Sequence, residues 1–176
     1  MIVVDTNVVS ELMRPSPSSQ VRDWVSAQAP GGLCTTAVTV AEIRYVLERL
    51  PDGRRKDSLL AAATEVFAAF SEFIQPFDAD AAVWYATIVA QRDRLGLPID
   101  GFDGQIAAIC RTHGAALATR NAKDFEETGI DVIDPWQQSQ PAEHTMPPTS
   151  RPATTHNSAD LSGLSAEFED RHLDAE

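Results

Sequence analysis

The chain opens with three aliphatic residues, at positions 2–4, that end at the acidic side chain of Asp5. A run that is apolar on both faces is typical of a strand buried inside a parallel sheet. The pattern then changes to helical spacing over residues 8–14, and Thr6 and Asn7 are both residue types that cap such a helix. The first 14 residues therefore predict a strand, an acid at its carboxyl end, and a helix.

The same exchange of short apolar runs and helical spacing continues along the chain. Further strands are predicted at residues 33–35, 72–77, 116–119 and 132–133. Helices are predicted at residues 20–28, 40–50, 59–70 and 102–113, and another that begins at Asp78 or Asp80 and ends at Arg94. Strands that alternate with helices predict an α/β fold, with three layers (α/β/α) around a central, mostly parallel sheet of about five strands.

The character of the sequence changes at residue 137. Residues 137–176 hold four of the 11 prolines and three of the four histidines, among runs of Ser and Thr. Such a composition cannot bury enough apolar surface to fold. We predict one folded domain over residues 1–136 and a disordered acidic tail over residues 137–176. Leu161, Leu164 and Phe168 form the only candidate helix face there, which raises the hypothesis that the tail folds back over the domain.

Composition narrows the protein classes that need to be considered. The formal net charge of −12 and the pI near 4.6 argue against a general nucleic-acid binder, which is usually basic. No apolar run approaches the roughly 20 residues of a membrane span, and no basic segment of a signal peptide precedes residues 2–4. Cys34 and Cys110 stand in no paired motif and are expected to be buried free thiols. These features favour a cytoplasmic protein without membrane segments.

Four acidic residues occupy equivalent places in this pattern. Asp5 ends the first strand, Glu42 lies in the first turn after the second strand, Asp103 opens the helix before the fourth strand, and Asp124 follows that strand. In a doubly wound sheet all four positions face the carboxyl edge, where such folds bind ligands. Each also has a simpler explanation: a helix cap for Asp5, a capping box with Thr39 for Glu42, a favourable helix-start charge for Asp103, and an Asx-turn for Asp124.

Clustered carboxylates restrict what such a site can do. Two like charges 4 Å apart repel by about 4 kcal/mol at an effective dielectric constant of 20. The acids must therefore take up protons or bind a cation. A ligand set of oxygen atoms without histidine or cysteine suits Mg²⁺ or Mn²⁺ and argues against zinc. Metal-assisted hydrolysis of a phosphodiester is the chemistry that this arrangement favours.

Four segments carry a specific resemblance, and they occur in the expected order over about residues 1–136. They are Val-Val-Asp-Thr-Asn-Val-Val-Ser-Glu-Leu, Thr-Val-Ala-Glu-Ile-Arg, Gly-Phe-Asp-Gly-Gln-Ile-Ala-Ala-Ile and Leu-Ala-Thr-Arg-Asn-Ala-Lys-Asp-Phe. These segments resemble the conserved blocks of the PIN-domain family. They are most similar to the VapC toxins of bacterial toxin–antitoxin pairs, including the FitB-like branch.

The resemblance implies a Mg²⁺-dependent endoribonuclease toxin, with Mn²⁺ as a substitute, that cuts RNA, forms a homodimer and is held inactive by a VapB-type antitoxin. It implies that Asp5 and Asp103 are the metal ligands and that Glu42 and Asp124 complete the acidic, catalytic site. It also implies polar positions that orient the acids or the phosphate, at Asn7, Thr119 and Asn121. Close to the acidic segments lie four cations that contact either phosphate or solvent, namely Arg14, Arg44, Arg120 and Lys123.

Two departures from the family and three alternatives accompany this interpretation. Gly104 lowers helix propensity directly after Asp103, and the tail extends beyond the usual end of the fold. A receiver signalling domain also clusters acids and Mg²⁺, but it needs a lysine after its last strand, and the chain has only Lys56 and Lys123. A dehalogenase-type phosphatase needs an acid where Asn7 stands. A PIN domain with weak catalysis that serves as a binding module remains open.

Overall fold

All five strands of the sheet run parallel, in the order β3-β2-β1-β4-β5. The computed structural model describes residues 1–70 and 73–137. The strands are short: β1 (Ile2–Val4), β2 (Leu33–Thr36), β3 (Ile74–Gln75), β4 (Ala116–Ala118) and β5 (Val132–Ile133). The predicted parallel sheet is thereby confirmed. Because β1 pairs with both β2 and β4, the strand order reverses beside β1, and the carboxyl ends of β1 and β4 are where open sheets of this kind bind ligands.

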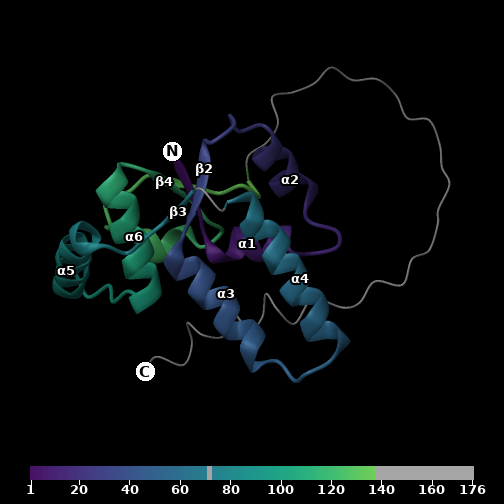
Figure 1. The fold of residues 1–176 in the computed structure, drawn as a ribbon. Coiled ribbons are helices and arrows are strands. Elements are labelled where there is room, and N and C mark those ends of the chain that lie inside the picture. The colour runs from purple at the N-terminus through teal and green to yellow at the C-terminus, as the bar shows by residue number, and fades with distance from the viewer. Residues whose placement is uncertain (71–72, 138–176) are drawn as a thin grey trace, which may run out of the picture.

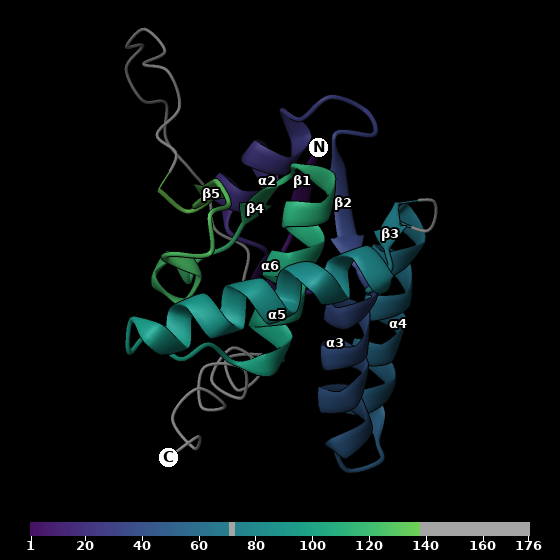
Figure 2. The same cartoon turned by 90° about the vertical axis from the view of Figure 1, so that its left-hand side faces the viewer.

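Helices cover both faces of this sheet, as the three-layer prediction requires (Figure 1). They are α1 (Thr6–Leu12), α2 (Ser19–Ser26), α3 (Ala37–Arg49), α4 (Arg54–Ala69), α5 (Ala79–Arg94) and α6 (Gly101–His113), followed by the short 3₁₀ helix η1 (Ala122–Phe125). One apolar cluster lies under α1, α2, α3 and α4, and a second lies under α5 and α6. Figure 2 shows α5 crossing in front of α6, on the face opposite α4.

The two apolar clusters explain why β1 is hydrophobic at every position. Val4 and Ala118 belong to the cluster under α1 to α4, whereas Val3 and Leu117 belong to the cluster under α5 and α6. All four side chains are fully buried. Successive side chains of a strand point to opposite faces, so a central strand covered on both sides needs apolar residues throughout.

Several helix boundaries correct the sequence-based expectations. The N-cap of α1 is Asp5, whose carboxylate accepts from the Thr6 amide, and not Thr6 or Asn7. The N-cap of α3 is Thr36, whose hydroxyl accepts from the Thr39 amide at 2.9 Å. Glu42 therefore lies in the second turn of α3 and not in the predicted capping box. Helix α4 begins at Arg54, five residues before its predicted start.

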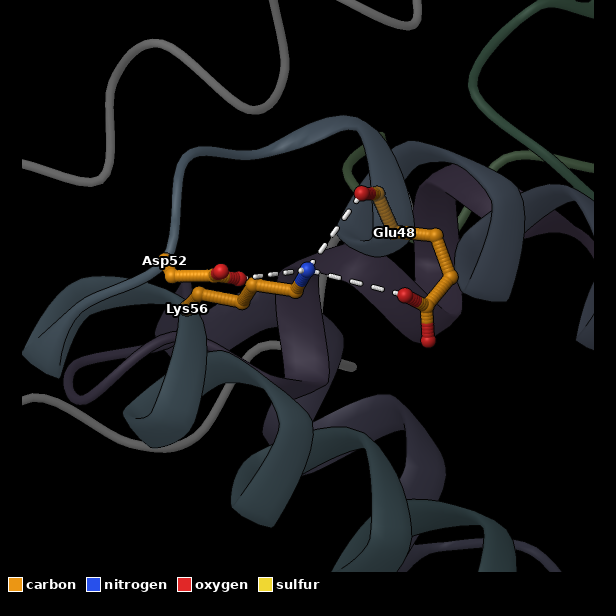
Figure 3. Close-up of polar contacts among 3 residues, drawn as sticks. All are labelled: Glu48, Asp52 and Lys56. Atoms are coloured by element: carbon orange, nitrogen blue, oxygen red, sulfur yellow. Dashed lines mark hydrogen bonds and ion pairs between the residues drawn. The ribbon is translucent and has the colours of Figure 1, made fainter.

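A lysine closes the exposed turn between α3 and α4 (Figure 3). The ammonium of Lys56 lies 3.2 Å from the Asp52 carboxylate and 3.5 Å from the Glu48 carboxylate, and it donates to the Glu48 carbonyl. The hydrogen bond to Asp52 raises the pKa of Lys56. These contacts join the end of α3 to the start of α4, away from the sheet.

The C-terminal segment, for which the sequence predicts disorder, begins at residue 137. The predicted disordered tail lies, from residue 138 onward, outside the described residues, together with the candidate face formed by Leu161, Leu164 and Phe168. In the part of the chain that is described, none of the helices combines the length and the apolar character needed to cross a bilayer.

Close packing between α5 and α6 explains why glycine stands at position 104, although glycine lowers helix propensity there. A Cβ atom added at Gly104 would lie 2.9 Å from Cε2 and 3.3 Å from Cδ2 of Tyr85 on α5. The Tyr85 ring is itself fixed by an edge-to-face contact with Phe77, with ring centroids 6.0 Å apart. Gly104 thus lets α5 approach α6 directly beside Asp103.

We predict that Gly104→Ala destabilises the protein, although alanine is the better helix former. The added methyl group must displace the Tyr85 ring, and overpacking of this kind costs about 1–3 kcal/mol against a gain in propensity of about 1 kcal/mol. Urea unfolding of the wild type, Gly104→Ala and Gly104→Ala/Tyr85→Leu measures the effect. The smaller leucine should restore much of the lost stability, and an unchanged midpoint in Gly104→Ala would contradict the steric argument.

Candidate active site

The acidic residues gather where the strand order reverses. Asp5 follows β1 directly, and its amide donates to the Ala118 carbonyl of β4 at 3.0 Å. Helix α3 contributes Glu42, the first turn of α6 contributes Asp103, and η1 contributes Asp124. The carboxyl ends of β1 and β4, the start of α6 and the first half of α3 therefore surround one site.

Three donors hold the Asp5 carboxylate in a single orientation. Its Oδ1 accepts from the Thr6 amide at 2.7 Å, and its Oδ2 accepts from the Thr119 hydroxyl at 2.7 Å and from the Asn7 side-chain amide at 2.9 Å. Only 5% of the Asp5 surface is exposed. A buried carboxylate is costly without such partners, so these donors stabilise it at the carboxyl end of β1.

Asn7 and Thr119 form a polar bridge between segments that are more than 100 residues apart. The Asn7 amide group also donates to the Thr119 hydroxyl at 2.9 Å, and the Asn7 carbonyl oxygen accepts from the Arg120 amide at 3.2 Å. The Asn121 amide donates to the same Thr119 hydroxyl at 3.1 Å. Asn7 and Thr119 therefore position Asp5, which is one of the two roles that the resemblance implies for them.

The hydroxyl of Thr6 donates to the Glu42 carboxylate at 2.6 Å, and sequence reasoning did not find this contact. The sequence pattern predicts Thr6 only as a helix cap, whereas its buried side chain joins α1 to α3. The sequence feature that indicates this contact is a threonine between Asp5 and Asn7, at the end of a buried strand. Glu42 is consequently a member of the site and not a capping residue.

The electrostatics of Asp103 show that the acids share one environment. Burial, followed by the nearby negative charges of Asp5, Glu42, Asp100 and Asp124, raises the pKa of Asp103 from 3.8 to about 9. Only 8% of the Asp103 surface is exposed. The other three acids predicted from the sequence thus lie close enough to Asp103 to act on its charge.

The donor set fits a hard divalent cation. Asp5 and Asp103 offer carboxylate oxygens, while His113 ends α6 ten residues after Asp103, roughly 15 Å along the helix. Burial raises the pKa of the Cys34 thiol to about 11 and that of Cys110 in the same direction, so neither supplies a thiolate at neutral pH. Within residues 1–70 and 73–137, no group of three or more His, Cys, Asp or Glu side chains is arranged to hold a metal ion. Mg²⁺ commonly uses one or two carboxylates and retains water.

The basic residues near the site differ in what they contact. Arg120 is exposed, and its guanidinium lies 5.7 Å from the centre of the Trp136 ring. Arg14 pairs with the buried Glu11 carboxylate at 3.3 Å. Arg44 and Lys123 are exposed. Contact of Arg120 or Asn121 with substrate remains a prediction.

The sequence is similar to known proteins over most of its length. The sequence profile of the PIN domain matches residues 2–130. The chain is 41% identical over 138 residues to VapC ribonuclease Y4jK of Sinorhizobium fredii, which covers 78% of this chain and 99% of that protein. It is 34% identical to Toxin FitB of Neisseria gonorrhoeae over 137 residues, and the match covers 77% of this chain and 99% of that protein. The match to the PIN profile decides against the receiver and phosphatase alternatives.

Solved structures agree with the fold. A structure of FitAB bound to the IR36 DNA fragment has a TM-score of 0.73 and 33% identity, and the match covers 80% of this chain and 99% of that one. The structure of FitAcB from Neisseria gonorrhoeae has a TM-score of 0.72 and 34% identity.

We predict that Asp103→Asn makes stability less dependent on pH in the absence of metal. A carboxyl group whose pKa is higher in the folded than in the unfolded protein stabilises the fold only while it is protonated. The folded wild type should therefore lose stability as pH rises from about 4 to about 9, by on the order of 1 kcal/mol for each pH unit. Thermal melting in EDTA across this range measures the effect.

The isosteric amide cannot lose the proton, so the melting temperature of Asp103→Asn should exceed that of the wild type by a margin that grows with pH. Asp57→Asn, which changes an exposed carboxylate on α4, should follow the wild type at every pH. A constant difference between wild type and Asp103→Asn would show that burial and the neighbouring acids do not raise the pKa of Asp103.

Proposed function

The chain belongs to the PIN-domain family, and from this membership we propose that it is a VapC-type endoribonuclease toxin that uses Mg²⁺ held by Asp5 and Asp103. The observation that carries this proposal is the convergence of four acids, of which Asp5 and Asp103 are buried, at the point where the strand order reverses. Relatives named VapC ribonuclease Y4jK and Ribonuclease VapC1 support the ribonuclease activity, and the matches cover 99% and 94% of those proteins.

The proposed roles follow from where each carboxylate lies. Asp5 and Asp103 supply the negative oxygens that a hard cation requires, and Glu42 and Asp124 lie on the other two elements that border them. Bound Mg²⁺ would lower the pKa of a water molecule and stabilise charge on phosphoryl oxygens. Asn7 and Thr119 keep the Asp5 carboxylate fixed, so that it does not need to reorient when substrate arrives.

An acidic protein needs local positive charge to hold RNA. A bound divalent cation reverses the sign of the potential at the carboxylates themselves. Arg120 lies between β4 and η1, Lys123 lies in η1, and both are exposed. We propose that Arg120 contacts phosphate and that Asn121 lies against the RNA backbone beside it.

We also propose a VapB-type antitoxin as partner, a homodimer as the assembly and the cytoplasm as location. Several structures of relatives are toxin–antitoxin complexes. The chain has a cavity of about 550 Å³ between α1, α2 and α4, with side chains such as Met13, Val25 and Phe70 along its wall. An apolar cavity of this size suits the hydrophobic face of a partner helix.

We predict that Asp5→Asn abolishes RNA cleavage without unfolding the protein. The substitution keeps the shape of the side chain but removes the charge that a cation requires, so the rate should fall at least about 100-fold. Purified wild type, Asp5→Asn and the surface variant Asp57→Asn are compared on total RNA in Mg²⁺ and in EDTA. Cleavage by wild type in EDTA, or by Asp5→Asn at the wild-type rate, would refute the metal-dependent mechanism.

We predict further that Mg²⁺ or Mn²⁺ raises the melting temperature of the wild type. A ligand that binds only the folded state at 100 times its dissociation constant stabilises by about 2.7 kcal/mol, which corresponds to several degrees for a chain of this length. Asp57→Asn should show the same shift, and Asp5→Asn should show little. Equal melting of wild type with and without either cation would argue for a PIN domain that acts as a binding module.

A further inference from the structure

Exposed aromatic rings are rare in this protein, and their positions are not scattered. Among residues 1–70 and 73–137, the aromatic side chains exposed by more than a third are Tyr45 at 52%, Phe73 at 38% and Phe102 at 37%. Tyr45 follows Glu42 by three residues, and Phe102 directly precedes Asp103. Two of the three exposed rings therefore adjoin acids of the candidate active site.

Tyr45 lies on the side of α3 that carries Glu42. Residues three and four apart on a helix are neighbours on its surface, so Glu42, Tyr45 and Arg49 form one stripe that begins at the acidic site. The Arg49 guanidinium lies 5.6 Å from the centre of the Tyr45 ring. The stripe thus presents a carboxylate, an aromatic ring and a positive charge in sequence along α3.

Phe102 lies in the first turn of α6, directly before Asp103. The Phe102 amide donates to the Asp100 carboxylate at 2.8 Å, which fixes the first turn of α6 and the place where the Phe102 ring emerges. Helices α3 and α6 contact each other, and in both views the start of α6 lies beside the upper half of α3 (Figures 1 and 2). The two exposed rings consequently stand on the two helices that enclose Glu42 and Asp103.

This arrangement matches the way proteins bind single-stranded nucleic acid. Unpaired bases stack on aromatic side chains, and stacking tolerates any base because every base has a π face. Stacking also adds affinity without adding positive charge, which suits a chain with a net charge of −12. Arginine beside the aromatic ring adds attraction for the backbone and for the base.

We propose that Tyr45 and Phe102 stack on unpaired bases on the two sides of the phosphate that lies at the acidic site. The inference rests on the proposed ribonuclease function and specifies its substrate as single-stranded RNA whose flanking bases are accessible. Arg49 supports the Tyr45 subsite by its charge. A helical duplex, whose bases are already stacked on one another, cannot occupy both rings.

The test measures RNA binding separately from cleavage. Fluorescence anisotropy in EDTA compares a labelled single-stranded RNA with an oligomer of the same length that has abasic positions. Tyr45→Leu and Phe102→Leu remove the ring but keep an apolar side chain, Tyr45→Phe retains the ring, and Phe73→Leu changes the exposed aromatic residue that lies away from the acids.

We expect Tyr45→Leu and Phe102→Leu each to weaken binding of the base-bearing RNA by about tenfold, consistent with the measured strength of base–aromatic stacking. Binding of the abasic oligomer should not change, and Tyr45→Phe and Phe73→Leu should bind as the wild type does. In Mg²⁺, the same two leucine variants should raise KM while leaving kcat nearly constant.

Three results that do not involve cleavage would overturn the inference. They are equal binding of base-bearing RNA by wild type and both leucine variants, an equal loss for base-bearing and abasic oligomers, and a change of oligomeric state in Tyr45→Leu on gel filtration, which would assign the ring to a protein interface. Cleavage with unchanged KM in both variants would end this inference but leave the ribonuclease. Base-dependent binding without any Mg²⁺-dependent cleavage would leave the rings and refute the catalytic proposal.

Discussion

Repulsion among carboxylates at one edge of the sheet is the constraint on which the rest of the site depends. Asp103 is almost fully buried beside Asp5, Glu42 and Asp124, and its pKa is raised to about 9. Such a group is neutral at physiological pH unless a cation compensates its charge. The metal-free protein therefore stores a proton at the position where the proposed function requires Mg²⁺, so cation binding and proton release are coupled.

The surrounding hydrogen bonds keep this unfavourable cluster in place. Thr119 and Asn7 bridge the ends of β4 and β1 and fix Asp5, and Thr6 fixes Glu42 from the neighbouring helix. These donors are themselves buried or half-buried directly after β1 and β4, so they do not need to reorganise. A preorganised set of oxygen ligands on a rigid support is what metal-assisted phosphodiester chemistry requires.

Charge alone does not explain how a protein with a pI near 4.6 would bind RNA. In the proposed arrangement the cation neutralises the acids at the phosphate, and the neutral rings of Tyr45 and Phe102 bind the bases on each side. Affinity then comes from stacking and from one local reversal of charge, and the remaining acidic surface repels nucleic acid that does not fit. Gly104 contributes indirectly, because its missing side chain lets α5 and α6 pack closely behind Asp103.

The sequence by itself determined the features that depend on neighbouring residues. Apolar runs predicted the parallel strands, helical spacing predicted a helix that ends at residue 113 as α6 does, and the four acids were recognised because each stands near a strand end or helix start. Tertiary structure alone decided the rest. The bond from Thr6 to Glu42, the pKa of Asp103 and the exposure of Tyr45 all depend on groups brought together only when the sheet closes. Periodicity records which face of an element is buried, but not which distant side chain meets it there.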